Sequence, residues 1–128
     1  KRRLEQVHMA EFAERYPAEL GDGMRKRVAI ARALTVDPRY VLFDEPTTSL
    51  DPVSARRVDK LIRELSDTLG VTSIVVSHDL VSIFSIADRI VMLYKGFVRL
   101  LGSRDEFRAS KDPIIDQFIH GRTEGPIE

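Results

Sequence analysis

The hydrophobic positions of the chain alternate between two spacings. Apolar residues recur at helical spacing over residues 1–14, 24–35 and 52–69, whereas residues 40–44 are a short continuous apolar run and residues 71–77 a short segment rich in β-branched residues, which predicts a second buried strand. Continuous apolar runs of this length are typical of parallel strands that are buried on both faces. The alternation of helix and strand therefore predicts an α/β fold with a mainly parallel sheet flanked by helices.

The C-terminal part of the chain has a different pattern. Residues 78–87 predict a short helix, and residues 88–102 predict two strands joined by a turn at Lys95–Gly96. Residues 103–110 and 112–121 predict two short terminal helices. The polar tail that follows them is expected to be frayed. The sequence thus predicts a hairpin and two helices after the parallel part.

Composition narrows the class of protein. The chain has 128 residues, of which 43% are hydrophobic and 31% charged, as in ordinary globular domains. Twenty basic and twenty acidic residues cancel, so the net charge gives no reason to expect binding to nucleic acid. The absence of cysteine excludes disulfides and thiolate metal sites. No apolar run approaches the roughly 20 residues of a transmembrane helix.

Polar side chains follow both predicted parallel strands. The first strand ends in "VLFDE" (residues 41–45) and the second in "VVSHD" (residues 75–79). The carboxyl ends of parallel strands meet at one edge of a sheet, where α/β proteins bind ligands. Asp44 is suited to Mg²⁺ beside a phosphate, and Glu45 to polarising a water that attacks phosphorus. The simpler alternative is an acidic pair that only caps a loop.

Four segments in order along the chain resemble motifs of the ATP-binding-cassette (ABC) ATPases. "VLFDEP" resembles the Walker B motif, "SLD" (residues 49–51) the D-loop, and "SHD" the segment with the switch histidine. "ELGDGMRKRVAIARAL" (residues 19–34) resembles the signature segment and its helix. The ending "DEFRASKDPIIDQFIHG" is similar to the ATPase subunits of Mla/Mce-type lipid transporters. This resemblance implies the fold of a P-loop NTPase domain.

The resemblance implies a role for each matching residue, with ATP and Mg²⁺ as cofactors. Asp44 would help to bind Mg²⁺, Glu45 would be the general base for water, and His78 would reach the γ-phosphate. Asp51 would lie at the interface between two ATPase subunits. The signature segment would close on ATP held by the opposing subunit, and it consists of Leu20, Gly21, Asp22, Gly23 and Met24.

The resemblance also implies partners and a location. The intact protein would form a homodimer, bind a membrane permease subunit, and be cytoplasmic, lying peripherally on the inner face of the cell membrane. It would power the transport of lipid, in particular phospholipid, and no nucleic acid is expected as a partner. Two alternatives remain open: a soluble ABC ATPase acting in nucleic-acid repair or translation, and a non-catalytic, truncated module that binds a partner.

The signature segment departs from the family pattern. The expected Leu-Ser-Gly-Gly reads Leu20-Gly21-Asp22-Gly23, so a carboxylate lies where phosphate would approach. Two negative charges about 4 Å apart repel by several kcal/mol at an effective dielectric of about 20. Asp22 is alternatively expected to cap the helix over residues 24–35, since Asp is a favoured N-cap. In both cases we expect weakened closure on the opposing ATP.

The phosphate-binding loop is a second departure. None of the seven glycines opens a G-x-x-x-x-G-K-S/T segment. The chain therefore resembles the C-terminal half of the domain: residues 1–38 end the helical subdomain with the signature, 39–102 hold the remaining motifs, and 103–128 form a helical extension. Without that loop, we expect these residues alone not to hydrolyse ATP. Apolar surface left uncovered is expected to cause self-association.

Overall fold

The computed structural model describes all 128 residues and divides them into two compact units, Lys1–Ser82 and Ile83–Glu128. Unit 1 contains a parallel pair of strands with helices, and unit 2 contains an antiparallel hairpin with helices. The predicted α/β class is confirmed. None of the helices is long and apolar enough to cross a bilayer.

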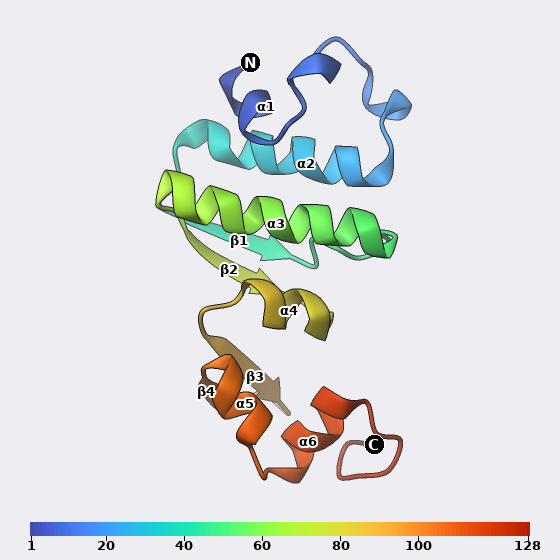
Figure 1. Cartoon of the computed structure of the whole chain (residues 1–128), viewed down its shortest axis with the longest axis vertical. Helices are drawn as coiled ribbons and strands as arrows, with labels where there is room; N and C mark the ends of the chain where they lie inside the picture. The colour runs from blue at the N-terminus through green and yellow to red at the C-terminus, as the bar shows by residue number, and fades with distance from the viewer. The chain divides into compact units, whose positions relative to one another are not determined.

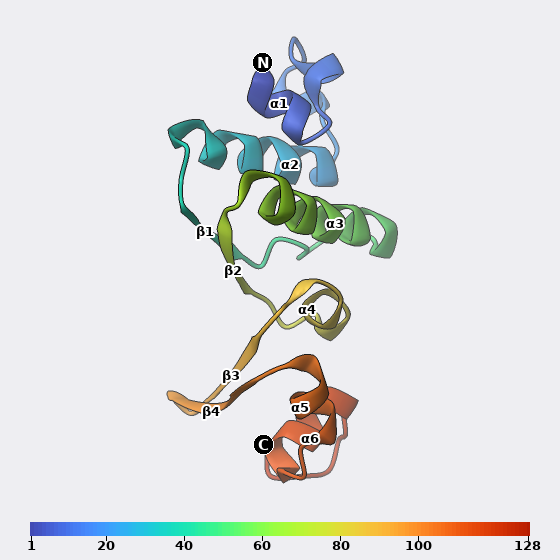
Figure 2. The same cartoon turned by 60° about the vertical axis from the view of Figure 1, so that its left-hand side comes forward.

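Unit 1 places helices against its parallel strands. β1 pairs in parallel with β2, and Asp44 lies opposite Val76 at the carboxyl end of the pair. Two long helices, α2 and α3, lie side by side (Figures 1 and 2). The elements are α1 (Arg2–Gln6), η1 (Ala10–Phe12), η2 (Pro17–Glu19), α2 (Asp22–Ala33), η3 (Leu34–Val36), β1 (Tyr40–Asp44), α3 (Pro52–Leu69), β2 (Thr72–Val76) and the start of α4 (Leu80–Ile86).

Helix α3 begins and ends as its sequence predicts. The Asp51 carboxylate accepts hydrogen bonds of 3.0 Å from the backbone N–H groups of Val53 and Ser54, which makes it the N-cap. Gly70 ends the helix in the left-handed conformation, at φ 65°. The apolar residues of one face are buried in the core of unit 1, and these are Ala55, Val58, Leu61, Ile62 and Leu65.

The predicted helix over residues 1–14 is wrong beyond Gln6. Val7 and Met9 are both fully buried, and His8 between them has a φ of 55°. Residues two apart in an α-helix lie about 200° apart around its axis, so a continuous helix cannot bury both in one core. The turn at His8 resolves this conflict, and the chain continues into η1.

Only one face of the parallel strands is covered. On β1, Val41 and Phe43 are buried, whereas Leu42 is 67% exposed. On β2, the apolar residues Ile74 and Val76 are also exposed. The prediction that both strands are buried on both faces is therefore wrong for this chain, since no described element packs on the second face. Burial alternates along both strands instead.

Unit 2 is built around a β-hairpin. β3 pairs antiparallel with β4, and Lys95 and Gly96 form the turn with φ values of 48° and 83°. Two consecutive positive φ values are typical of the type I′ turn that suits the twist of a hairpin. The predicted hairpin and terminal helices are confirmed. After the remainder of α4, the elements are β3 (Ile90–Tyr94), β4 (Phe97–Gly102), α5 (Arg104–Ala109) and α6 (Pro113–His120).

The C-terminal tail is not frayed as predicted, because a buried amide holds it. The Nε2 atom of Gln117 donates to the carbonyl oxygens of Arg122 and Ile127, at 3.3 and 3.1 Å. Its Oε1 atom accepts from the N–H of Ile127 at 2.7 Å. Buried polar groups need such partners, so the tail folds back on α6 to supply them.

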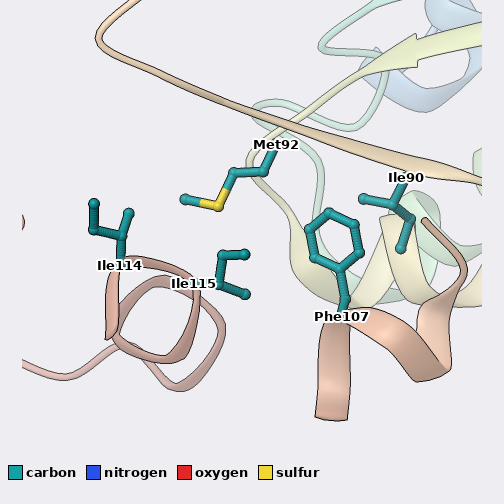
Figure 3. Packing of buried hydrophobic residues seen from close by; sticks show 5 residues of the cluster. All are labelled: Ile90, Met92, Phe107, Ile114 and Ile115. Atoms are coloured by element: carbon teal, nitrogen blue, oxygen red, sulfur yellow. The ribbon is translucent and has the colours of Figure 1, made fainter. Parts of the chain in front are cut away.

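The core of unit 2 joins the hairpin to the terminal helices. Figure 3 shows side chains from β3, α5 and α6 pointing toward one another. All of them are buried: Ile90, Met92, Phe107, Ile114 and Ile115. The apolar stripes of the two terminal helices therefore pack against the hairpin.

The core of unit 2 predicts a contrast between two phenylalanines. Phe107→Ala should lower the free energy of unfolding by about 3–5 kcal/mol, because it removes a buried ring and leaves a cavity. Phe118→Ala on α6 is the matched control, since Phe118 is 41% exposed, and it should lower that free energy by less than about 1.5 kcal/mol. Chemical denaturation measures both values, and equal losses would refute this account of the core.

Candidate functional site

The carboxyl ends of β1 and β2 bring an acid and a histidine together. Asp44 is the last residue of β1, and Glu45 follows with its N–H donating to the carbonyl oxygen of Val76 at 2.8 Å. The Oε1 atom of Glu45 lies 2.9 Å from Nδ1 of His78. The prediction that the polar residues after both strands share one edge of the sheet is confirmed.

Backbone geometry turns Glu45 out of the strand. Its φ is 47°, a left-handed value that is uncommon for a residue other than glycine. The turn continues with a hydrogen bond of 3.3 Å from the N–H of Thr48 to the carbonyl oxygen of Glu45. The hydroxyl of Thr48 donates to the Oε2 atom of Glu45 at 3.1 Å. One carboxylate oxygen is therefore held by Thr48 and the other by His78.

The contact between Glu45 and His78 shifts both groups. The hydrogen bond from His78 lowers the pKa of Glu45 below its ordinary value, and the hydrogen bond from Thr48 lowers it further. The same contact with Glu45 raises the pKa of His78, and the charge of Asp79 adds to this shift. Between the two pKa values, Glu45 is ionised and His78 is protonated.

The acidic residues at this edge fit one kind of metal ion. The structure contains no group of three or more His, Cys, Asp or Glu side chains that could hold a metal ion. Mg²⁺ is usually held by one or two carboxylates together with waters and phosphate oxygens. Asp44 offers one exposed carboxylate beside Glu45 and therefore fits an ion shared with a phosphate, but not a metal centre built from protein ligands alone.

The signature segment lies at the beginning of α2. Gly21 is the N-cap and Asp22 the first helical residue, so the predicted capping by Asp22 is wrong. The helix begins earlier than residue 24, which places the Asp22 backbone in the helix instead of at the extended cap position. Its carboxylate pairs with Nη2 of Arg25, whose Nη1 donates to the carbonyl oxygen of Leu20 at 2.8 Å. Arg25 therefore partly offsets the charge of Asp22.

The signature segment and Asp51 lie in the same region. A Cβ atom added to Gly23 would be 3.4 Å from Cβ of Ser54, whose N–H is bonded to Asp51. Met24 follows on α2 and is half-buried. In Figure 1 the first turns of α2 and α3 lie at the same end of the helix pair. The predicted residues thus form two groups, one at these helix starts and one at the sheet edge.

The sequence analysis did not identify the polar residues that support the group at the sheet edge. Arg56 and Asp59 on α3 contact Asp79, the residue after His78, and Ser82 at the start of α4. Thr48 was missed as well. One signal could have found the network: Asp59 interrupts the apolar face of α3 next to Val58, and a charge on a buried face needs partners.

The chain is similar to a known family and to several known proteins. The family model described as "ABC transporter" matches residues 1–48. The "Intermembrane phospholipid transport system ATP-binding protein MlaF" of Escherichia coli strain K12 is 40% identical over 125 residues, which is 98% of this chain and 46% of that protein. The "Probable ribonucleotide transport ATP-binding protein mkl" of Mycobacterium leprae is 34% identical over 98% of this chain and 36% of that protein.

A solved structure is similar in fold. The ADP conformation of MJ1267, an ATP-binding cassette of an ABC transporter, matches with a TM-score of 0.82 and 25% identity, over 94% of this chain and 48% of that chain. The chain thus spans about half the length of MlaF and of this solved structure. It spans 36% of the length of mkl.

The contact at the sheet edge predicts a change in the titration of His78. Glu45→Gln removes the negative charge that stabilises the protonated imidazole, so the pKa of His78 should fall toward its ordinary value. An NMR titration of the histidine ring protons measures this pKa. An unchanged pKa of His78 would show that the contact with Glu45 does not exist in solution.

Proposed function

The chain belongs to the ABC transporter ATPase family, and on this basis we propose that the intact protein hydrolyses ATP to drive a membrane transporter. The observation that carries the proposal is the contact between Glu45 and His78 at the carboxyl ends of two parallel strands, directly after Asp44. Ligands of α/β proteins bind at such an edge. The pairing of a carboxylate base with an imidazole suits the attack of water on a phosphate.

Each residue at the sheet edge has a distinct proposed role. Asp44 helps to hold Mg²⁺, which neutralises charge on the phosphates when it is bound. Glu45 accepts a proton from the attacking water, and its lowered pKa keeps it ionised for this purpose. Because Nδ1 of His78 faces Glu45, Nε2 is the nitrogen that donates to the γ-phosphate.

The helix starts have a proposed role in trans. We place the signature segment, Leu20–Met24, against the nucleotide of the opposing subunit, and Asp51 at the interface of the two subunits. The close approach of Ser54 to Gly23, where an added Cβ atom would lie 3.4 Å from Cβ of Ser54, supports a joint surface formed by the starts of α2 and α3. In this proposal the protein is a homodimer bound to a permease at the inner, cytoplasmic face of the cell membrane.

The isolated chain has two proposed properties. The exposed apolar side chains of the uncovered sheet face, such as Leu42 and Ile74, support its self-association. No segment of these 128 residues matches the phosphate-binding loop, so we propose that they do not hydrolyse ATP without the rest of the protein.

Phospholipid is the proposed transported substrate. The relative named for intermembrane phospholipid transport is 40% identical to this chain, whereas the relative named for ribonucleotide transport is 34% identical. The higher identity supports phospholipid. We expect the transported molecule to contact the permease and not this chain. The substrate therefore has to be tested with the whole transporter.

Substitution of the proposed base tests the proposed function. In the intact transporter, Glu45→Gln should lower kcat for ATP by a factor of about 10²–10⁴, because a general base is lost, with ATP affinity retained. Phospholipid transfer between vesicles should stop in the same variant. Glu14→Gln, which changes an exposed glutamate of unit 1, is the control and should leave both unchanged. Full ATPase activity in Glu45→Gln would overturn the proposal.

A second prediction concerns the signature segment. The double substitution Gly21→Ser with Asp22→Gly restores the family pattern and removes a negative charge, so the ATPase activity of the intact protein should rise. The pair with Arg25 is more than one-third exposed on both sides and offsets only part of the repulsion. Asp22→Asn, which removes the charge alone, separates the two effects. If neither variant is faster than the native protein, Asp22 does not weaken closure.

A further inference from the structure

A buried carboxylate lies on the core face of α3. Asp59 is 3% exposed, and burial raises its pKa. A carboxylate in such surroundings requires charged or hydrogen-bonding partners. Arg56, one turn earlier on the same helix, places Nη1 2.9 Å from Oδ2 of Asp59. These two residues are close in the sequence, whereas the other contacts of Arg56 are with residues far along the chain.

The same arginine extends to the residues after His78. Nη2 of Arg56 donates to Oδ2 of Asp79 at 2.5 Å and to the hydroxyl of Ser82 at 3.0 Å. The Ser82 hydroxyl lies 2.9 Å from the Oδ2 atoms of both Asp59 and Asp79. Four side chains therefore form one network between α3 and the start of α4, all of it inside unit 1.

Asp79 fixes the backbone on both sides of His78. Its N–H donates to the hydroxyl of Ser77 at 3.0 Å. Its Oδ1 atom accepts from the N–H groups of Val81 and Ser82, at 3.0 and 3.2 Å. His78 itself is an exposed side chain whose one hydrogen-bond partner is Glu45. The position of its ring therefore depends on the loop that Asp79 holds.

We propose that Arg56 and Asp59 are positioning residues for His78. In this inference, which rests on the proposed function, Asp59 orients the guanidinium and the guanidinium holds Asp79. Asp79 in turn holds the loop so that the imidazole meets Glu45. Because Arg56 lies on the helix that Asp51 caps, the network also links the proposed subunit interface to the catalytic pair.

Two features separate this role from simple packing. Arg56 contacts Asp59 through one terminal nitrogen and Asp79 through the other, and the point charge of a lysine does not reproduce this fixed planar arrangement of donors. The Oδ1 atom of Asp59 is buried without a hydrogen-bond partner. Well-packed apolar residues often stabilise a core as well as a buried ion pair does. An incompletely satisfied network at this place therefore indicates a purpose other than stability.

The test uses Arg56→Gln and Arg56→Lys in the intact protein, with Arg57→Gln as the control. Arg57 is the next residue of α3 and is exposed, so the control removes the same charge without the bridge. The first readout is the pKa of the His78 ring by NMR. Loss of a nearby positive charge by itself raises the pKa of a histidine, whereas loss of the contact with Glu45 lowers it.

We expect the pKa of His78 to fall in both Arg56 variants and not in Arg57→Gln. We also expect kcat for ATP to fall about tenfold in the Arg56 variants with KM within about twofold, as for a group that acts through a catalytic residue. Arg56→Lys keeps the positive charge, so it serves as the test variant if Arg56→Gln does not fold. A pKa of His78 that stays or rises in the folded Arg56 variants would overturn the inference. Absence of ATPase activity in the native protein would instead overturn the proposed function, and the pKa readout would still test the positioning.

Discussion

The parallel pairing of β1 with β2 is the constraint on which the candidate site depends. Because Asp44 lies opposite Val76, the residues that follow each strand emerge at one edge of the sheet. The N–H of Glu45 extends the pairing by one hydrogen bond, to the carbonyl oxygen of Val76. A register shifted by one residue would move His78 along the edge and turn alternate side chains to the other face. The contact between Glu45 and His78 is thus a consequence of the register.

Features with local signals could be predicted from the sequence. Asp51–Pro52 and Gly70 set the ends of α3, Lys95–Gly96 sets the hairpin turn, and short apolar or β-branched segments set both parallel strands. The shared edge of Asp44, Glu45 and His78 followed from strand direction alone. Each of these predictions needs only neighbouring residues or the general geometry of parallel sheets.

The remaining features depend on contacts between distant residues. The break at His8 exists because Val7 and Met9 enter the same core, and the tail is held by Gln117, up to 10 residues away. Arg56 meets Asp79 across 23 residues. Periodicity within one element carries no information on such partners. The uncovered sheet face is a different case. An apolar run predicts that a strand is buried, but it does not identify the segment that covers the strand.

The most direct test of the account is a structure of the intact Glu45→Gln protein with ATP and Mg²⁺. The account predicts that the γ-phosphate lies at the carboxyl ends of β1 and β2, within reach of Asp44 and His78. It also predicts that residues 20–24 of the opposing subunit face the same nucleotide. A nucleotide bound away from this edge, with His78 remote from its phosphates, would contradict the account.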